Sequence, residues 1–158
     1  MFSRCVILSA LGVCAAAVCG CFGRVIDIFP SQQCPPRDLI VALTTDPDAP
    51  PSLKDTYYST AGCTIQFEVM EHHVLIVDPN DPRWTPIGGL NYELRVLPLE
   101  PDGRHETGTL PSDGRMNVPT VTGNRSVVLT VFAEEYRPGS DEPIPFDVTA
   151  LVYLDDPE

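Results

Sequence analysis

The sequence predicts an all-β fold, a two-sheet antiparallel β-sandwich, and two features of the chain lead to that prediction. After Arg24, apolar and polar residues alternate with a period of two, which is the period of a strand with one buried face. Between the alternating runs lie short segments rich in Pro, Asp, Asn and Gly, which are the residues that form tight turns. About seven short strands separated by such turns favour two packed sheets.

Three runs show the alternation most clearly, at residues 63–70, 90–96 and 146–154. The residues expected to face the core are Cys63, Ile65, Phe67, Val69, Leu90, Tyr92, Leu94, Val96, Phe146, Val148, Ala150, Val152 and Leu154. Further runs are apolar at both parities, which fits strands near the centre of a sheet or covered on both faces. These runs are residues 38–44, 73–78 and 126–133.

The segment GGLNYELRVLPLEPDGR, residues 88–104, has a Tyr followed by alternating apolar residues and then a turn. It resembles a late strand of an immunoglobulin-like or fibronectin type III-like domain, and this resemblance implies an immunoglobulin-like sandwich. The core tryptophan expected on an early strand of such domains is missing, because Trp84 lies in the loop-like segment DPRWTP. A transthyretin-like sandwich is equally compatible with the pattern.

The chain has 158 residues, which is enough for one domain and a short leader. Its 22 acidic and 10 basic residues give a formal net charge of −12. Because an acidic surface repels phosphate groups, we expect neither nucleic acid nor anionic lipid headgroups as partners. Any attachment to a membrane must therefore come from the N-terminal segment.

The first residues have the layout of an export signal. Residues 1–4 carry one positive side chain, and residues 5–23 include no charged residue. Within this stretch, Val18-Cys19-Gly20-Cys21 resembles the lipobox of bacterial lipoproteins, with a branched apolar residue three before the cysteine and a small residue just before it. The resemblance implies cleavage between Gly20 and Cys21, a thioether-linked lipid on Cys21, and acylation of its new amino group by a fatty acid such as palmitate.

Two other interpretations of the leader stay open. Ala15-Ala16-Ala17 satisfies the small-x-small rule for ordinary secretory cleavage before Val18. Residues 5–23 also reach the minimum length of an uncleaved transmembrane anchor, although Arg4 and Arg24 flank them almost symmetrically. The lipobox interpretation divides the chain into a signal peptide at 1–20, a lipidated N-terminus and tether at 21–36, and the sandwich at 37–158.

The part after the signal holds two cysteines besides Cys21, namely Cys34 and Cys63. In an oxidising compartment this pair suggests one disulfide, with Cys34 placed before the first strand of the domain. The bridge would close a loop of about 30 residues and would stabilise the fold through the entropy of the unfolded chain. The alternative is two buried thiols.

No motif for catalysis, phosphate binding or metal binding stands out. His72 and His73 are adjacent, so on a strand they would point to opposite faces and could not easily share a metal ion. The loops TDPD, with Asp46 and Asp48, and DPNDP, with Asp78, Asn80 and Asp81, supply oxygen ligands suited to calcium. They lack the spacing of an EF-hand, however, and such loops usually form turns. We therefore predict no metal, no cofactor and no enzymatic activity.

Three aromatic residues in loop-like contexts, Trp84, Tyr57 and Tyr58, are candidates for a ligand platform. Exposed aromatic side chains often anchor partners, because they combine a large apolar area with low conformational freedom. The alternative is that these residues pack at the edge of the core.

These observations predict a lipid-anchored protein of the cell envelope, in which the sandwich acts as a binding or assembly component with an envelope protein as partner. Phe22, and not Asp, follows Cys21. In a Gram-negative cell this leaves the outer membrane open as the location, on its periplasmic side or at the surface. The second hypothesis is a secreted or surface sandwich that binds carbohydrate or another ligand through its loops.

Overall fold

The computed structural model describes residues 24–33, 40–45, 56–72, 83–99, 103–119, 123–135 and 141–155. Within these ranges the chain forms ten strands and no helix. The strands are β1 (Val25–Gln33), β2 (Ile40–Ala42), β3 (Thr56–Thr60), β4 (Thr64–His72), β5 (Thr85–Pro86), β6 (Asn91–Leu97), β7 (Arg104–Thr109), β8 (Arg115–Val118), β9 (Arg125–Glu135) and β10 (Ile144–Asp155).

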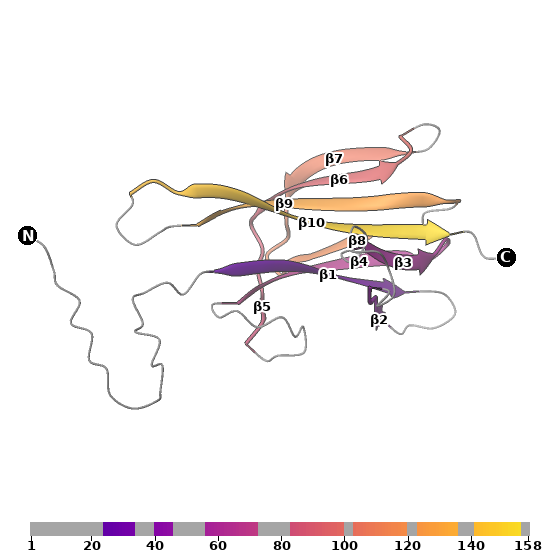
Figure 1. Ribbon diagram of the computed structural model, residues 1–158, viewed down its shortest axis with the longest axis horizontal. Coiled ribbons are helices and arrows are strands. Elements are labelled where there is room, and N and C mark those ends of the chain that lie inside the picture. The colour runs from indigo at the N-terminus through magenta and orange to yellow at the C-terminus, as the bar shows by residue number, and fades with distance from the viewer. Residues whose placement is uncertain are drawn as a thin grey trace, which may run out of the picture.

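The strands form two sheets, which Figure 1 shows as two layers packed against each other. Sheet A has the order β2-β1-β4-β5, and β8 also pairs with β4. Sheet B has the order β3-β10-β9-β6-β7. The prediction of an all-β, two-sheet sandwich is therefore confirmed.

The core lies between the two sheets, and the predicted alternation explains it. In β4, Ile65, Phe67 and Val69 are 0% exposed, while the residues between them face outward and are only partly buried. Strands β6, β9 and β10 supply the opposite wall. Their buried apolar residues are Leu94, Val96, Val127, Leu129, Val131, Ala133, Ala150, Val152 and Leu154. Strand β9 lies at the centre of sheet B, in agreement with its apolar residues at both parities.

One strand pair departs from the predicted antiparallel arrangement. Strand β3 runs parallel to β10, with Tyr58 opposite Tyr153. The turn at residues 61–63 then leads directly from β3 in sheet B to β4 in sheet A. Strands β3 and β4 therefore lie in different sheets and cannot form a hairpin with each other.

The prediction of a tether at residues 21–36 is wrong over most of its length. Residues Val25–Gln33 form β1, which pairs with β4 without interruption from Val25 opposite His72 to Gln33 opposite Thr64. Ile26 and Ile28 are only 5% and 2% exposed, so burial of their apolar side chains holds the segment in the sandwich. The sandwich thus includes Val25–Gln33, and Cys34 follows the first described strand instead of preceding it.

Some predicted features lie outside the described residues. These are the predicted strand at 73–78, the imidazole of His73, and the oxygen-rich loops with Asp46, Asp48, Asp78, Asn80 and Asp81. Of the predicted strand at 38–44, Ile40–Ala42 form β2.

The turn predicted at PSDGR is confirmed, and it carries the chain from β7 in sheet B to β8 in sheet A. The amide of Gly114 donates a hydrogen bond to the carbonyl of Pro111 at 3.0 Å. Gly114 has a φ of +68°, and a Cβ there would lie 2.7 Å from the carbonyl oxygens of Ile87 and Val69. Only glycine satisfies both the backbone angle and the lack of space.

Candidate functional site

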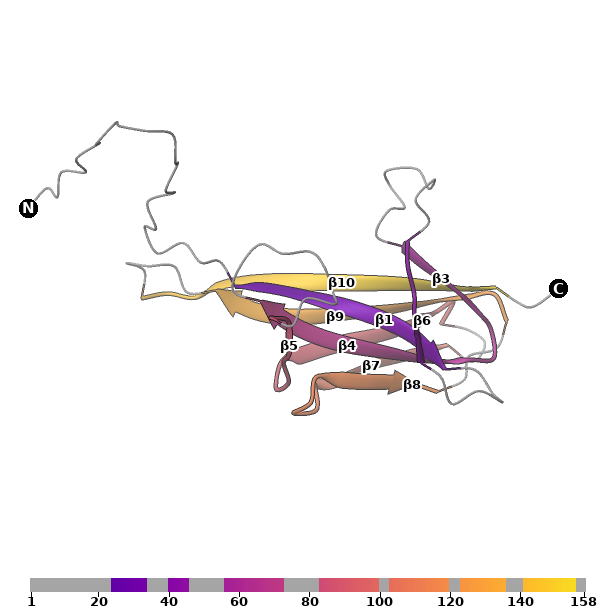
Figure 2. The same cartoon turned by 90° about the horizontal axis from the view of Figure 1, so that it is seen from below.

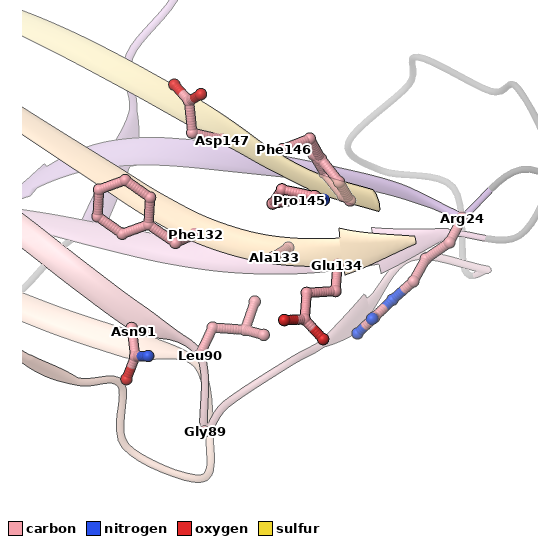
Figure 3. Close-up of a pocket in the computed structure, with 10 residues that line it drawn as sticks. All are labelled: Arg24, Gly89, Leu90, Asn91, Phe132, Ala133, Glu134, Pro145, Phe146 and Asp147. Atoms are coloured by element: carbon pink, nitrogen blue, oxygen red, sulfur yellow. The ribbon is translucent and has the colours of Figure 1, made fainter. Parts of the chain in front are cut away.

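A groove of about 580 Å³ opens at the end of the sandwich where β1 begins. Figure 2 shows that β1 starts at the end where β9 finishes and β10 starts. The lining residues come from these strands and from the segment that enters β6, and Figure 3 labels all of them. They are Arg24, Gly89, Leu90, Asn91, Phe132, Ala133, Glu134, Pro145, Phe146 and Asp147.

Strand register brings these residues to one place. Phe132 on β9 lies opposite Asp147 on β10 and opposite Asn91 on β6. Glu134 lies opposite Pro145, two residues closer to the end of the β9–β10 pair. The walls of the groove are therefore built on three hydrogen-bonded strands, which hold its shape more firmly than loops would.

The groove combines apolar side chains with a mostly acidic rim. Phe132 is 46% exposed, and Figure 3 shows Glu134 directed into the same space that Arg24 enters from the other side. Arg24 Nε donates a hydrogen bond to Glu71 Oε2 at 2.7 Å, so this cation already has a carboxylate partner on β4. The carboxylates of Glu134 and Asp147 also line the groove. Such a surface suits an apolar ligand or surface that carries an amine.

Trp84 does not belong to an exposed platform, since it is only 5% exposed. Its ring lies edge-to-face against Phe29, with centroids 5.2 Å apart, and 5.4 Å from the ring of His72. Phe29 and His72 alternate with the core-facing residues of β1 and β4, so Trp84 covers the outer surface of sheet A. The burial of Trp84 does not fit the predicted exposed platform, and its ring packs on the outer surface of sheet A and not at the edge of the core.

The two tyrosines of the predicted platform lie on β3, in sheet B. Tyr57 packs partly buried against the core, whereas Tyr58 is 41% exposed. Tyr58 stacks with Tyr153 of β10, with ring centroids 5.9 Å apart and an interplanar angle of 26°. The sequence pattern placed Tyr153 among the outward residues of its strand, but the stacking needs the parallel β3–β10 register, which the sequence did not reveal.

The β6–β7 hairpin brings together an imidazole and a carboxylate that are 12 residues apart in sequence. His105 Nε2 lies 2.9 Å from Glu93 Oε1, and Arg95 Nε lies 3.5 Å from the same oxygen. The side chain of His105 is 52% exposed. These groups lie on an open strand surface, outside the groove, and fit the role of cross-strand polar pairs that stabilise a hairpin.

On the core-facing side of the same hairpin, Tyr92 on β6 forms a second polar contact, with Glu106 on β7. Its hydroxyl donates a hydrogen bond to Glu106 Oε1 at 3.1 Å. Burial, and then the hydrogen bond and charge of Glu106, raise the pKa of Tyr92, while the charge of Arg104 acts in the opposite direction. The ring also covers Gly108 on β7, where an added Cβ would lie 3.1 Å from ring atoms.

Of the remaining predicted residues, Cys63 and His72 are described, and the others lie outside the described residues. Cys63 is 5% exposed, while Gly20, Cys21 and Cys34 lie outside the described residues. His72 is buried at the end of β4. Across the described ranges, no group of three or more His, Cys, Asp or Glu residues is arranged to hold a metal ion.

No helix among the described residues is long and apolar enough to cross a membrane. Comparison with known protein families, curated proteins and solved structures finds no match to this chain. Its function is therefore inferred from its own residues and their geometry.

Proposed function

We propose that this protein is anchored to a membrane of the cell envelope by a lipid on Cys21 and presents its β-sandwich as a non-enzymatic binding or assembly component. The supporting observation is the motif Val18-Cys19-Gly20-Cys21 at the end of an uncharged stretch. The first strand begins at Val25, only four residues after Cys21. A signal peptide of 20 residues followed by an anchor would thus lead straight into the folded domain.

Several acyl chains on one cysteine would hold the protein on the membrane stably, whereas a single chain binds only marginally. The acidic domain itself would add no electrostatic attraction to anionic lipids. The groove at the start of β1 and the exposed pair Tyr58–Tyr153 offer two surfaces for a partner, which we propose to be another envelope protein.

A disulfide between Cys34 and Cys63 is part of this proposal. The last pair of the β1–β4 ladder is Gln33 opposite Thr64. The next residue after Gln33 is Cys34, and the residue before Thr64 is Cys63. Opposed residues in an antiparallel pair have Cα atoms about 4.5 to 5.5 Å apart, which suits a disulfide. Such a bridge would fit an oxidising compartment outside the cytoplasm.

The second candidate function is ligand binding by a secreted or surface sandwich, with carbohydrate as the ligand. The observation that favours it is the stacked pair Tyr58–Tyr153, in which both rings are more than one-third exposed. Exposed aromatic faces offer apolar area together with hydroxyl groups for hydrogen bonds, and sugars present the same combination. The groove and this pair lie on different parts of the molecule, so the two candidates can be tested separately.

Membrane fractionation of the full-length protein tests the anchor. We expect wild type and Cys19→Ala to stay in the detergent-soluble membrane fraction, because Ala is also small enough for the middle of the lipobox. Cys21→Ala should lose the anchor. Equal distribution of Cys19→Ala and Cys21→Ala between the fractions would contradict the proposal.

Co-purification from the solubilised envelope then separates an assembly component from a ligand binder. A stable protein partner in stoichiometric amount is expected for the leading candidate. Saturable sugar binding without such a partner would favour the second candidate, provided that Tyr153→Ala abolishes it and Phe132→Ala, at the groove, does not.

A further inference from the structure

The distance along the chain between Cys21 and the groove is short. Arg24 lines the groove, and three peptide steps separate it from Cys21. Even when fully extended, three steps span at most about 11 Å. A lipid on Cys21 would therefore hold the groove end of the sandwich within this distance of the membrane surface. This step rests on the proposed function.

The same end of the sandwich exposes apolar side chains. Ile144, the first residue of β10, is 37% exposed, and Phe132 on β9 is 46% exposed. Phe132 lies opposite Asp147, three residues along β10 from Ile144, so the two apolar side chains lie near the end of the β9–β10 pair but point to opposite faces of it. Leu99, in contrast, is 48% exposed just after β6, at the far end of the sandwich from the start of β1.

The charged side chains at the groove end of the sandwich determine which lipid headgroups this end can contact. Glu134 and Asp147 line the groove, and Asp141 and Glu142 are exposed next to the start of β10. Arg24, the cation of the groove, is already paired with Glu71. Carboxylates attract the ammonium groups of ethanolamine headgroups and are repelled by anionic headgroups.

We infer that the groove end of the sandwich docks end-on on the lipid surface that carries the anchor, with Ile144 and Phe132 as its apolar contacts on the two faces of the β9–β10 pair and ethanolamine headgroups as its polar partners. The anchor keeps the sandwich at a high effective concentration near the membrane surface. Even a weak contact between the two would therefore be populated. The sandwich would then present its far end, and with it Leu99, away from the membrane.

Quenching of introduced tryptophans by brominated lipids tests this orientation. The full-length, acylated protein is reconstituted into vesicles of phosphatidylethanolamine and phosphatidylcholine with brominated acyl chains. Ile144→Trp and Phe132→Trp should be quenched several-fold more than Leu99→Trp, the matched exposed control at the far end. Wild type supplies the background from Trp84, which is buried.

The outcomes separate this inference from the proposed function. Acylated protein with equal quenching at all three positions would overturn the orientation and leave the anchor intact. Protein that carries no acyl group would overturn both. Replacing phosphatidylethanolamine with phosphatidylglycerol should lower the quenching of Ile144→Trp, and an increase would contradict the proposed role of the carboxylates.

Discussion

Removing the proposed bridge between Cys34 and Cys63 should lower the free energy of unfolding by an amount that depends on the length of the loop that the bridge closes. Strands β1 and β4 are paired along all nine residues of β1, up to Gln33 opposite Thr64. The proposed bridge joins the residue that follows Gln33 in the sequence to the residue that precedes Thr64. Its main effect would then be to restrict the unfolded chain.

The magnitude follows from the loop that the bridge would close. Counted inclusively, residues 34–63 make a loop of 30 residues. For that length the chain-entropy relation gives about 3.6 kcal/mol at 25 °C. This is a large fraction of the 5 to 15 kcal/mol that is typical of folded domains.

Urea unfolding of wild type, Cys34→Ala, Cys63→Ala and the double variant measures this free energy as a double-mutant cycle. If the bridge forms, each single variant already loses it, so the double variant should be about as unstable as either single variant. Reductant should destabilise wild type by a similar amount and leave the variants unchanged. Single losses that simply add in the double variant, or a wild type that is insensitive to reductant, would refute the reasoning.

Three further predictions follow from the described residues. Phe67→Ala should cost about 3 to 5 kcal/mol in urea unfolding, because Phe67 is 0% exposed in the core; a loss below about 1 kcal/mol would contradict its role. Gly114→Ala should lower the melting temperature more than Gly62→Ala, since both have positive φ but only Gly114 has carbonyl oxygens within 3 Å of an added Cβ; equal shifts would contradict the steric argument. Ultraviolet titration should detect a phenol that ionises above the ordinary range of tyrosine and is missing in Tyr92→Phe. Because the folded pKa of Tyr92 is raised, its contribution to stability is complete below the ordinary pKa and is lost as the pH rises through the folded value.

Strands with a strict alternation of apolar and polar residues could be predicted from the sequence, and β4 is the clearest example. Ile65, Phe67 and Val69 were expected to face the core, and all three are 0% exposed. Strand β1 was missed although Ile26 and Ile28 alternate correctly. Pro30 lies within the run and a double proline follows it, which is unusual for a strand, whereas pairing with β4 keeps the segment extended and in the sheet.

The aromatic residues show where local sequence no longer suffices. The segment DPRWTP has the composition of a loop, yet Trp84 is buried because Phe29 and His72 lie beside it on the outer surface of sheet A. The stacking of Tyr58 on Tyr153 depends on a parallel strand pair whose members are about 95 residues apart. The alternation of residues within one strand does not reveal which distant strand will lie beside it.

The mass of the intact protein from the membrane fraction tests the lipid anchor most directly. The lipoprotein hypothesis predicts a chain that begins at Cys21 and carries the added mass of a diacylglyceryl group and an acyl group. It further predicts that Cys21→Ala yields no such species. An unmodified chain that begins at Val18 and is recovered in the soluble fraction would contradict the anchor and support the secreted alternative.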